Sequence, residues 1–303
     1  MVYLLSASGE RRESCCHQKT MFKSLTNIPI IDSHVHVFPQ KLSEAVTRWF
    51  ESHAWTFKYQ GTAKDLIRIL FDNGVAGVVL LSYAHRTGIS HQLNKFTAAL
   101  VKHFPHTVGF ATLHPEDENP REIIKLSLMD LGLRGVKLHC HVQKTAPDDP
   151  ILFPTYEAIL EFDGILNIHA GREPDIDAYG LDVRAITGAK RVEKVLQRYP
   201  DLKIIIPHLG FDESDRFYSL LDHYPNLYLD TTMMMGHFFD VSVDRDRCIQ
   251  YADRILYGSD YPHIPYEMEM EVRAILGLNL GEEATRKILF ENATKLFHIA
   301  PRL

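Results

Sequence analysis

The sequence predicts an α/β fold, a single-domain (β/α)₈ TIM barrel that follows an N-terminal extension, and three observations support it. From residue 28 onward, short β-branched runs alternate with longer amphipathic segments, as in parallel sheets with crossover helices. Eight such units are present, and barrels of this kind have about 250 residues. No Gly-rich phosphate turn follows the first strand, so the competing doubly wound sheet fits less well.

The runs expected to form strands are short and rich in Val, Ile and Leu. In chain order they are IPIIDSHV (28–35), VAGVVLLS (75–82), TVGFAT (107–112), LRGVKLHC (133–140), GILNIHA (164–170), LKIIIPH (202–208), NLYLDTT (226–232) and DRILYGSD (253–260). The segments between them have helical spacing, and several end with Gly or Pro, where a helix stops. Examples are TAKDLIRILFDNG, PREIIKLSLMDLG, AKRVEKVLQRYP and EEATRKILFENATKLF.

No repeat, low-complexity tract or linker divides the patterned part of the chain. We therefore expect one domain over residues 28–303, preceded by a flexible extension over 1–27, with Met21 as an alternative start. Two insertions, residues 38–61 and 171–187, follow the first and fifth strands. They are expected at the carboxyl ends of the strands, where barrels build their active sites, and to form the pocket wall.

The composition excludes several classes of protein. The chain of 303 residues has a net charge of −6 and no long basic run, which argues against nucleic acid or an anionic membrane surface as a partner. No apolar run is long enough to span a bilayer, and the first residues lack the basic start of a secretory signal. Four cysteines without zinc-ribbon or disulfide spacing fit a reducing compartment, so a cytoplasmic location is expected.

The first strand places two histidines at alternate positions. An extended strand points residues i and i+2 to the same side, so Asp32, His34 and His36 are expected to face one way and Val35 and Val37 the other. Such a pair is compatible with a metal site, and it is also compatible with a solvated edge strand.

Ionisable side chains recur where other strands end, and these ends meet at one rim of a barrel. They are Lys137, His139, His141, His169, His208, Asp230 and Asp260. Each alone would more often be a satisfied polar group of the core, but together they indicate a shared metal ion. Imidazoles and a carboxylate suit Zn²⁺ or a similar divalent ion, which lowers the pKa of water to about 7 and polarises a carbonyl. An aspartate at the metal can then move a proton to the leaving group.

Several motifs, in order and one per strand, carry a family resemblance. They are IDSHVHVF, RGVKLH, NIHAG, IIPHLG and LYGSDYP, followed by the terminal ILFENATKLF. With them the chain resembles the amidohydrolase superfamily, specifically the amidohydrolase-related group of metal-dependent barrel hydrolases and decarboxylases. The resemblance implies that His34, His36, His169 and Asp260 ligate one divalent ion, with Zn²⁺ favoured over Mn²⁺ or Fe²⁺. It also implies a catalytic His208 beside the substrate, and a homodimer, since dimers are common among such barrels.

The role of Lys137 stays open between two interpretations. Some binuclear relatives carry a carbamylated lysine at this strand end, and His208 would then join a second ion. Alternatively, Lys137 is a hydrogen-bond donor to the substrate or a partner of Asp230. One ion is favoured, and a second is not excluded.

Three further residues are assigned to substrate binding. His139 and His141 exceed the family motif, and one of them is expected to reach the pocket while the other belongs to the rim. Arg172 follows the fifth-strand ligand and could grip a substrate carboxylate in bidentate fashion. An ion pair with Glu173 or Asp175 is the alternative for this arginine.

The function expected from these residues is hydrolysis of a small organic substrate with an amide, lactone or ester-like carbonyl. Asp260 would be the base, and His208 and Lys137 would stabilise the oxyanion. A non-oxidative decarboxylase of a small carboxylic acid, with Arg172 or another cation holding the acid, is the alternative. A metal-binding barrel without catalysis is a third, disfavoured hypothesis, because the ligand set is complete. Specificity depends on the strand-end loops, so the sequence does not identify the substrate.

Overall fold

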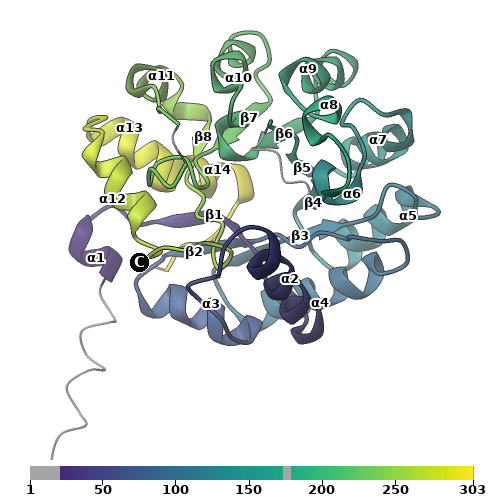
Figure 1. The fold of residues 1–303 in the computed structure, drawn as a ribbon, viewed down its shortest axis with the longest axis horizontal. Coiled ribbons are helices and arrows are strands. Elements are labelled where there is room, and N and C mark those ends of the chain that lie inside the picture. The colour runs from purple at the N-terminus through teal and green to yellow at the C-terminus, as the bar shows by residue number, and fades with distance from the viewer. Residues whose placement is uncertain (1–20, 173–178, 240, 303) are drawn as a thin grey trace, which may run out of the picture.

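The computed structural model describes residues 21–172, 179–239 and 241–302. Eight strands pair in parallel in the order β1 to β8, with helices packed around them, which confirms the predicted barrel (Figure 1). The strands are β1 (Ile31–Val35), β2 (Gly77–Leu80), β3 (Thr107–Thr112), β4 (Gly135–His139), β5 (Ile165–His169), β6 (Lys203–Ile206), β7 (Leu227–Asp230) and β8 (Ile255–Leu256). Each lies within the run predicted for it.

The helices follow the strands in alternation, with additional short helices in the loops. They are α1 (Met21–Leu25), α2 (Gln40–His53), α3 (Ala63–Asp72), α4 (Ser90–His103), α5 (Pro120–Lys125), α6 (Cys140–Gln143), α7 (Phe153–Glu161), α8 (Val183–Ile186), α9 (Ala189–Arg198), α10 (Ser214–Leu221), α11 (Arg245–Gln250), α12 (Met270–Gly277), α13 (Glu282–Arg286) and α14 (Asn292–Phe297). Across the described residues, none of these helices has the length and apolarity needed to cross a membrane.

The ring closes where the chain beyond β8 meets β1. The backbone N–H of Ser33 donates to the carbonyl of Tyr257 at 2.9 Å, and that of Asp260 donates to the carbonyl of His34 at 3.0 Å. These are separate hydrogen bonds and not a regular ladder, so β8 is shorter than the predicted 253–260. Closure therefore places His34 and Asp260, two of the predicted ligands, next to each other.

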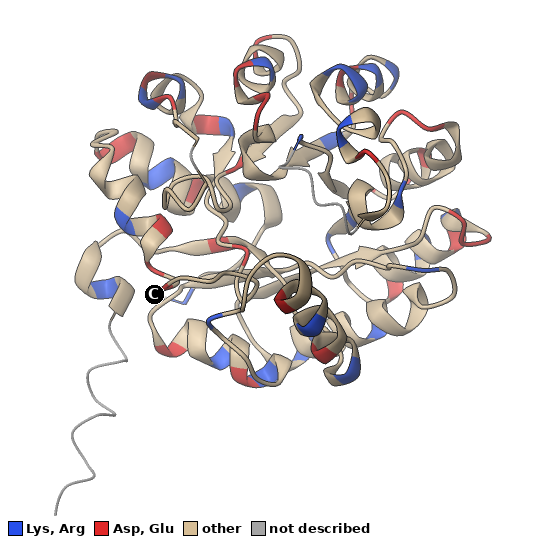
Figure 2. Ribbon diagram, in the orientation of Figure 1, with Lys and Arg blue, Asp and Glu red and all other residues tan. Residues whose placement is uncertain are grey.

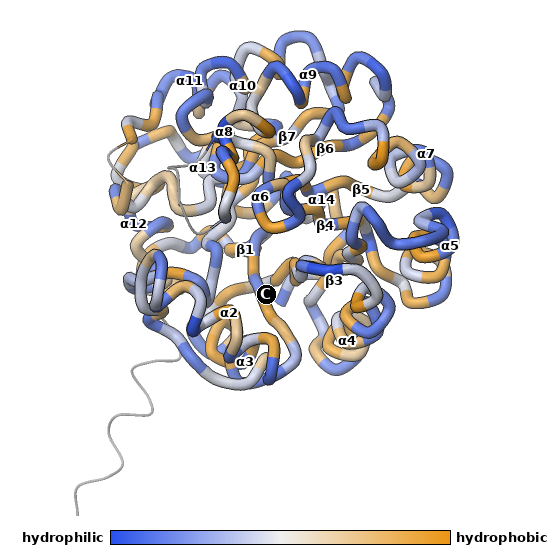
Figure 3. The backbone as a smooth tube through the Cα atoms, turned by 45° about the vertical axis from the view of Figure 1, so that its right-hand side comes forward, coloured by the Kyte–Doolittle hydropathy of each residue, from blue (hydrophilic) through white to orange (hydrophobic). Residues whose placement is uncertain are grey.

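Apolar side chains fill the barrel and the layer between strands and helices. Ile31, Val79, Phe110, Ile165 and Leu256 form an inner cluster together with residues of α14. The tube in Figure 3 is hydrophobic mainly along the strands and hydrophilic on many outer segments, and in Figure 2 charged residues lie largely on the outer helices. Burial on both faces explains why the strands are nearly continuous apolar runs.

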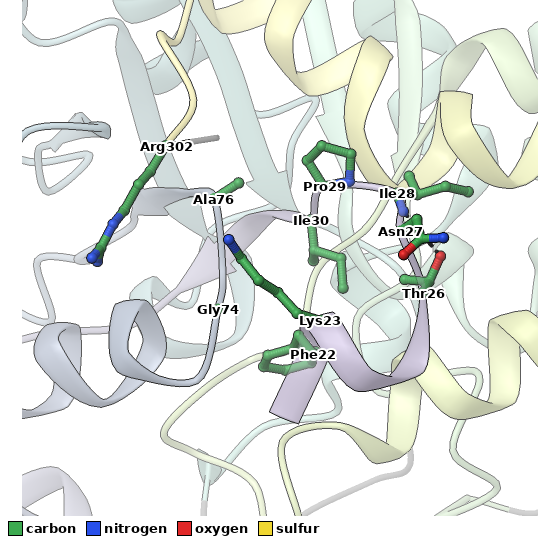
Figure 4. A pocket seen from close by; sticks show the side chains of 10 residues that line it. All are labelled: Phe22, Lys23, Thr26, Asn27, Ile28, Pro29, Ile30, Gly74, Ala76 and Arg302. Atoms are coloured by element: carbon green, nitrogen blue, oxygen red, sulfur yellow. Dashed lines mark hydrogen bonds between the residues drawn. The ribbon is translucent and has the colours of Figure 1, made fainter. Parts of the chain in front are cut away.

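Helix α1 lies at the amino ends of the strands. Phe22 of this helix is buried, and its N–H donates to the carbonyl of Asn73 at 3.0 Å. A cavity of about 300 Å³ lies between α1, the segment that leads into β1, and Arg302 (Figure 4). Its lining, within the described residues, holds the cations Lys23 and Arg302 but no carboxylate or imidazole. Most of the predicted extension, residues 1–20, lies outside the described residues.

The two predicted insertions follow β1 and β5. The first forms α2, whose apolar residues recur at helical spacing although none of its residues is fully buried. Trp55, in the same insertion, donates from its indole N–H to the carbonyl of His263 at 2.8 Å. Of the second insertion, residues 173–178 lie outside the described residues, and α8 belongs to its remainder.

A buried carboxylate holds the loop that follows β7. Glu271 of α12 accepts hydrogen bonds from the N–H groups of Met235 (2.8 Å) and Gly236 (3.1 Å) and from the Tyr266 hydroxyl (2.7 Å). Burial raises the pKa of Glu271 to about 7, although these hydrogen bonds act in the opposite direction. The folded protein therefore binds a proton here at pH values where the unfolded chain has released it.

We expect this group to destabilise the fold as the pH rises. The pKa of Glu271 is higher in the folded protein than in the unfolded chain, so its protonation stabilises the fold fully at pH values below the pKa of the unfolded chain. This stabilisation is lost as the pH rises to about 7. Relative to Glu271→Gln, the wild-type free energy of unfolding should fall between pH 5 and 7 by up to about 1.4 kcal/mol per pH unit. Urea unfolding of both proteins across this range measures the slope, and a constant difference between them would contradict the assignment.

Candidate metal centre

Three polar side chains converge at the seam between β1 and β8. His34 Nε2 lies 3.2 Å from His36 Nε2, and Asp260 Oδ1 lies 3.1 Å from His36 Nε2 and 3.5 Å from His34 Nε2. All three residues are buried. The structure thus brings together the two histidines of the first strand and the aspartate of the eighth, as the sequence predicted.

The outer ring nitrogens of the two histidines have acceptor partners. His36 Nδ1 lies 2.7 Å from the carbonyl oxygen of Leu81, and His34 Nδ1 lies 2.9 Å from Asp230 Oδ2. Because a carbonyl oxygen and a carboxylate only accept, each Nδ1 carries the hydrogen. In the neutral rings, both Nε2 atoms then present lone pairs toward each other and toward Asp260.

Three acceptors so close together require positive charge between them. Burial lowers the pKa of His34 well below its ordinary value, and the charges of Lys137 and His36 add to this. Burial alone would raise the pKa of Asp260, but its contacts with the neighbouring histidines hold this pKa well below its ordinary range.

A divalent ion fits this arrangement of lone-pair atoms, which would be its ligands. Around a tetrahedral zinc with bonds of about 2.0–2.1 Å, ligand atoms are about 3.4 Å apart. The observed separations of 3.1–3.5 Å match this value. Two imidazoles and one carboxylate are donors that Zn²⁺ and Mn²⁺ both accept.

Asp230, at the end of β7, contacts the His34 ring on the nitrogen that faces away from the candidate metal centre. Its carboxylate accepts from His34 Nδ1 and from the backbone N–H groups of His208 (3.2 Å) and Thr232 (3.1 Å). Such a partner fixes the ring and makes the ligand nitrogen more basic. The sequence placed Asp230 on the polar rim and as a possible partner of Lys137, and the structure shows that it is the partner of His34.

Asp32 does not join the two histidines, contrary to the alternation expected for this strand. The pairing of β1 shifts register between Asp32 and Val35, which breaks the period of two. The Asp32 carboxylate accepts from the N–H groups of His34 (3.1 Å) and Ser259 (3.1 Å) and from the Ser259 hydroxyl. Asp32 therefore links β1 to the chain after β8.

Lys137 of β4 is fully buried beneath the centre. Its ammonium donates to Asn167 Oδ1 at 2.8 Å and lies 3.4 Å from His34 Nε2. Its side chain is therefore held next to one candidate ligand. Asn167, which sequence reasoning did not single out, is its neighbour on β5.

His208 follows β6 in a left-handed backbone conformation, with φ 57°. Its Nδ1 lies 3.0 Å from the carbonyl of Thr232, and its ring centroid is 4.7 Å from that of His169. Two residues on, Gly210 has φ 80°, and a Cβ there would overlap the ring of Phe217. The turn thus requires glycine, and it places His208 in the cavity between the histidine clusters.

His169 lies in a second cluster, together with His139 and His141. Their ring nitrogens are all within 4.8 Å of one another, and the rings of His139 and His169 stack with centroids 4.0 Å apart. His36, His169 and Asp260 line one small cavity of about 50 Å³. Three of the four predicted ligands therefore line one cavity, while His34, His36 and Asp260 form one cluster and His169 belongs to another.

Arg172 makes an ion pair, with its Nε 3.3 Å from Glu213 Oε2. Glu213 also accepts a hydrogen bond from the N–H of Ala189. Glu213, in the turn after β6, therefore contacts both Arg172 and the start of α9. The predicted partners Glu173 and Asp175 lie outside the described residues. Substrate binding by Arg172 stays a prediction.

His263, which sequence reasoning left without a role, lines the cavity beside His36. Its ring stacks against those of His36 (centroids 4.9 Å apart) and Phe57 (4.6 Å). Burial lowers the pKa of His263 to about 3, and the charge of His36 adds to this effect. A neutral, aromatic imidazole thus forms one wall, and only the folded arrangement places it there.

A larger chamber of about 300 Å³ adjoins this cavity, and we call it the α2 chamber. From α2, the residues Leu42, Ala45, Val46, Trp49 and Phe50 line it. Within the described part of the chain, the residues that line both spaces are Phe50, Tyr83, His139 and Tyr179. The apolar face of α2 therefore lines a partly open pocket and not a packed core, which explains why the helix has no fully buried residue.

Asp230 offers a direct test of the metal centre. Asp230→Asn keeps the size of the side chain but removes its charge, so we expect affinity for Zn²⁺ to fall about 10- to 100-fold. Competition with a chromogenic chelator measures the dissociation constant. Asp163→Asn, which alters a surface ion pair with Lys203, is the control and should leave it unchanged. An unaltered constant in Asp230→Asn would show that this carboxylate does not support a metal ligand.

Comparison with solved structures shows the same fold in enzymes of different reaction classes. 5-Carboxyvanillate decarboxylase from Novosphingobium aromaticivorans, complexed with manganese and 4-hydroxy-3-methoxy-5-nitrobenzoic acid, is 18% identical, with a TM-score of 0.67 over 93% of this chain and 99% of that one. A probable 2-pyrone-4,6-dicarboxylic acid hydrolase from Acinetobacter baumannii is 17% identical, with a TM-score of 0.59 over 89% of this chain and 99% of that one.

4-Oxalomesaconate hydratase from Rhodopseudomonas palustris is also 17% identical, with a TM-score of 0.57 over 89% of this chain and 95% of that one. No curated protein sequence matches the chain significantly. A family model described as Amidohydrolase matches residues 31–299, which is nearly the whole barrel. The chain therefore belongs to the amidohydrolase family.

Proposed function

We propose that this protein is a metal-dependent hydrolase that acts on an amide, lactone or ester-like carbonyl of a small organic substrate. The observation that carries the proposal is the convergence of His34 Nε2, His36 Nε2 and Asp260 Oδ1 within 3.5 Å at a cavity. A divalent ion held there, Zn²⁺ by preference, supplies a Lewis acid that polarises a carbonyl and acidifies water. His169, across the cavity, is the predicted fourth ligand.

In this proposal, each side chain around the cavity has a different role in the reaction. Asp260 accepts a proton from the attacking water and passes it to the leaving group, because its carboxylate is ionised and lines the cavity. His208 stabilises the oxyanion from the opposite wall. Lys137, whose Nζ lies 3.4 Å from His34 Nε2, contributes a buried positive charge to the stabilisation of the oxyanion.

The substrate body is proposed to occupy the α2 chamber. Its walls are mainly apolar and aromatic, with Trp49, Phe50 and Tyr83 among them, while Lys144 and His85 also line it. A flat apolar group fits such walls, and an anionic substituent would pair with Lys144. We therefore favour a small, planar, acidic substrate over a long or strongly polar one.

A non-oxidative decarboxylase is the second candidate, and the aromatic α2 chamber favours it. The chamber would hold a ring, and the structural relatives include 5-carboxyvanillate decarboxylases. Lys144 lines the chamber, whereas Arg172 is paired with Glu213, so Lys144 is the better-placed cation for a second acidic group.

A substrate panel separates the two candidates. Purified protein reconstituted with Zn²⁺ or Mn²⁺ is assayed on lactones, amides and esters beside hydroxylated aromatic carboxylic acids. Asp260→Asn should lower kcat by at least about 100-fold at saturating metal, since the proton carrier is lost. Asn tolerates the left-handed backbone of residue 260, with φ 69°, so the fold should persist.

The control for this variant is Asp253→Asn, a surface change near β8 that should keep full activity. Release of carbon dioxide without consumption of water would replace the hydrolase proposal with the decarboxylase. Unaltered turnover in Asp260→Asn would overturn the role given to Asp260 in either reaction.

A further inference from the structure

His263 is a buried imidazole on the wall of the cavity that also holds His36 and Asp260. Only 4% of this residue is exposed, and within residues 21–172, 179–239 and 241–302 neither of its ring nitrogens makes a hydrogen bond. A buried polar group is costly unless a partner is supplied. A bound molecule in the cavity would supply that partner.

The contacts of His263 fix its position and leave its ring nitrogens unused. Its backbone N–H donates to the carbonyl of Asp260 at 2.8 Å, and its carbonyl accepts from the indole N–H of Trp55 at 2.8 Å. The ring lies nearly parallel to those of His36 and Phe57, with interplanar angles of 20° and 16°. Stacking uses the faces of the ring, whereas both nitrogens lie at its edge. The hydrogen-bonding edge is therefore held in place in advance of any ligand.

Much of the cavity wall is aromatic or apolar. The indole N–H of Trp55, which lines the cavity, is already used by the carbonyl of His263. Other wall residues without a side-chain hydrogen-bond donor are Phe50, Phe211, Met233 and Phe239. His263 consequently adds a polar group to a part of the site that otherwise excludes water.

We propose that His263 is a substrate-binding residue, whose ring N–H donates a hydrogen bond to an oxygen of the substrate beside the metal centre. This inference rests on the proposed function, since it requires the cavity to hold the substrate. The groups that a divalent ion attracts are carbonyl and carboxylate oxygens, which only accept hydrogen bonds. An imidazole has at least one N–H in either protonation state, so the role does not depend on titration of the ring.

A second cavity accounts for the other ring nitrogen. His263 also lines a polar space of about 260 Å³ beside α2, together with Ser43, Glu44 and Thr47. Because the ring lines both spaces, one nitrogen can serve the substrate and the other the polar space. The hydrogen bond to the substrate orients its carbonyl or carboxylate at the metal centre, and this holds for hydrolysis and for decarboxylation alike.

Binding of benzoate to the Co²⁺-loaded full chain tests the proposal without an assay of turnover. The visible absorption of Co²⁺ reports first the dissociation constant of the metal and then that of benzoate. His263→Phe keeps the stacked ring and removes both nitrogens, so benzoate should bind about 10-fold more weakly while affinity for Co²⁺ is unchanged. His91→Phe, which changes an exposed histidine of α4, is the control and should alter neither constant.

Two conservative variants test whether the N–H itself is responsible. The amide N–H groups of His263→Asn and His263→Gln replace those at Nδ1 and Nε2, so one of the two variants should recover part of the affinity for benzoate. Phe57→Leu removes a stacked ring but keeps both nitrogens of His263, so it should bind benzoate more tightly than His263→Phe does.

The outcomes distinguish failure of this inference from failure of the proposed function. No Co²⁺ bound by wild type would contradict the metal centre and both proposals with it. Bound Co²⁺ with no affinity for benzoate, or with equal affinity in wild type and His263→Phe, would overturn only the role of His263. A parallel loss of Co²⁺ in His263→Phe, or an equal loss of benzoate affinity in Phe57→Leu, would reduce this role to packing and also overturn it. Thermal melting and circular dichroism verify the fold of each variant.

Discussion

The need for positive charge between three acceptor atoms is the constraint on which the rest of the site depends. His34, His36 and Asp260 lie within 3.5 Å of one another in a buried place, which is costly unless a cation or a proton lies between them. Barrel closure holds them there. Gly258 permits it, since a Cβ at this position would lie 2.7 Å from the Cβ of His34.

The structure places the candidate metal centre and the α2 chamber in neighbouring parts of the barrel. Asp230, Lys137 and Asn167 hold the polar side chains by buried hydrogen bonds within the barrel. The α2 chamber lies on the other side of the cavity, and its walls come from an inserted helix. In the proposed function, a change in α2 therefore alters the substrate while the centre stays intact, as expected for this fold.

This division is consistent with the range of enzymes that share the fold. A decarboxylase, a probable hydrolase and a hydratase superpose on the same barrel although each is less than 20% identical to this chain.

The sequence by itself determined the barrel, the order of its strands and the residues of its polar rim, because periodicity and strand-end position are local properties. His34, His36 and Asp260 could be grouped from it since parallel strand ends meet at one edge. The tertiary structure decided what depends on contacts distant in the chain. The register shift directed Asp32 to Ser259, the tautomers followed from Leu81 and Asp230, and the pairing of β4 with β5 placed His169 against His139. Side-chain partners across a barrel depend on closure and register, which no local pattern encodes.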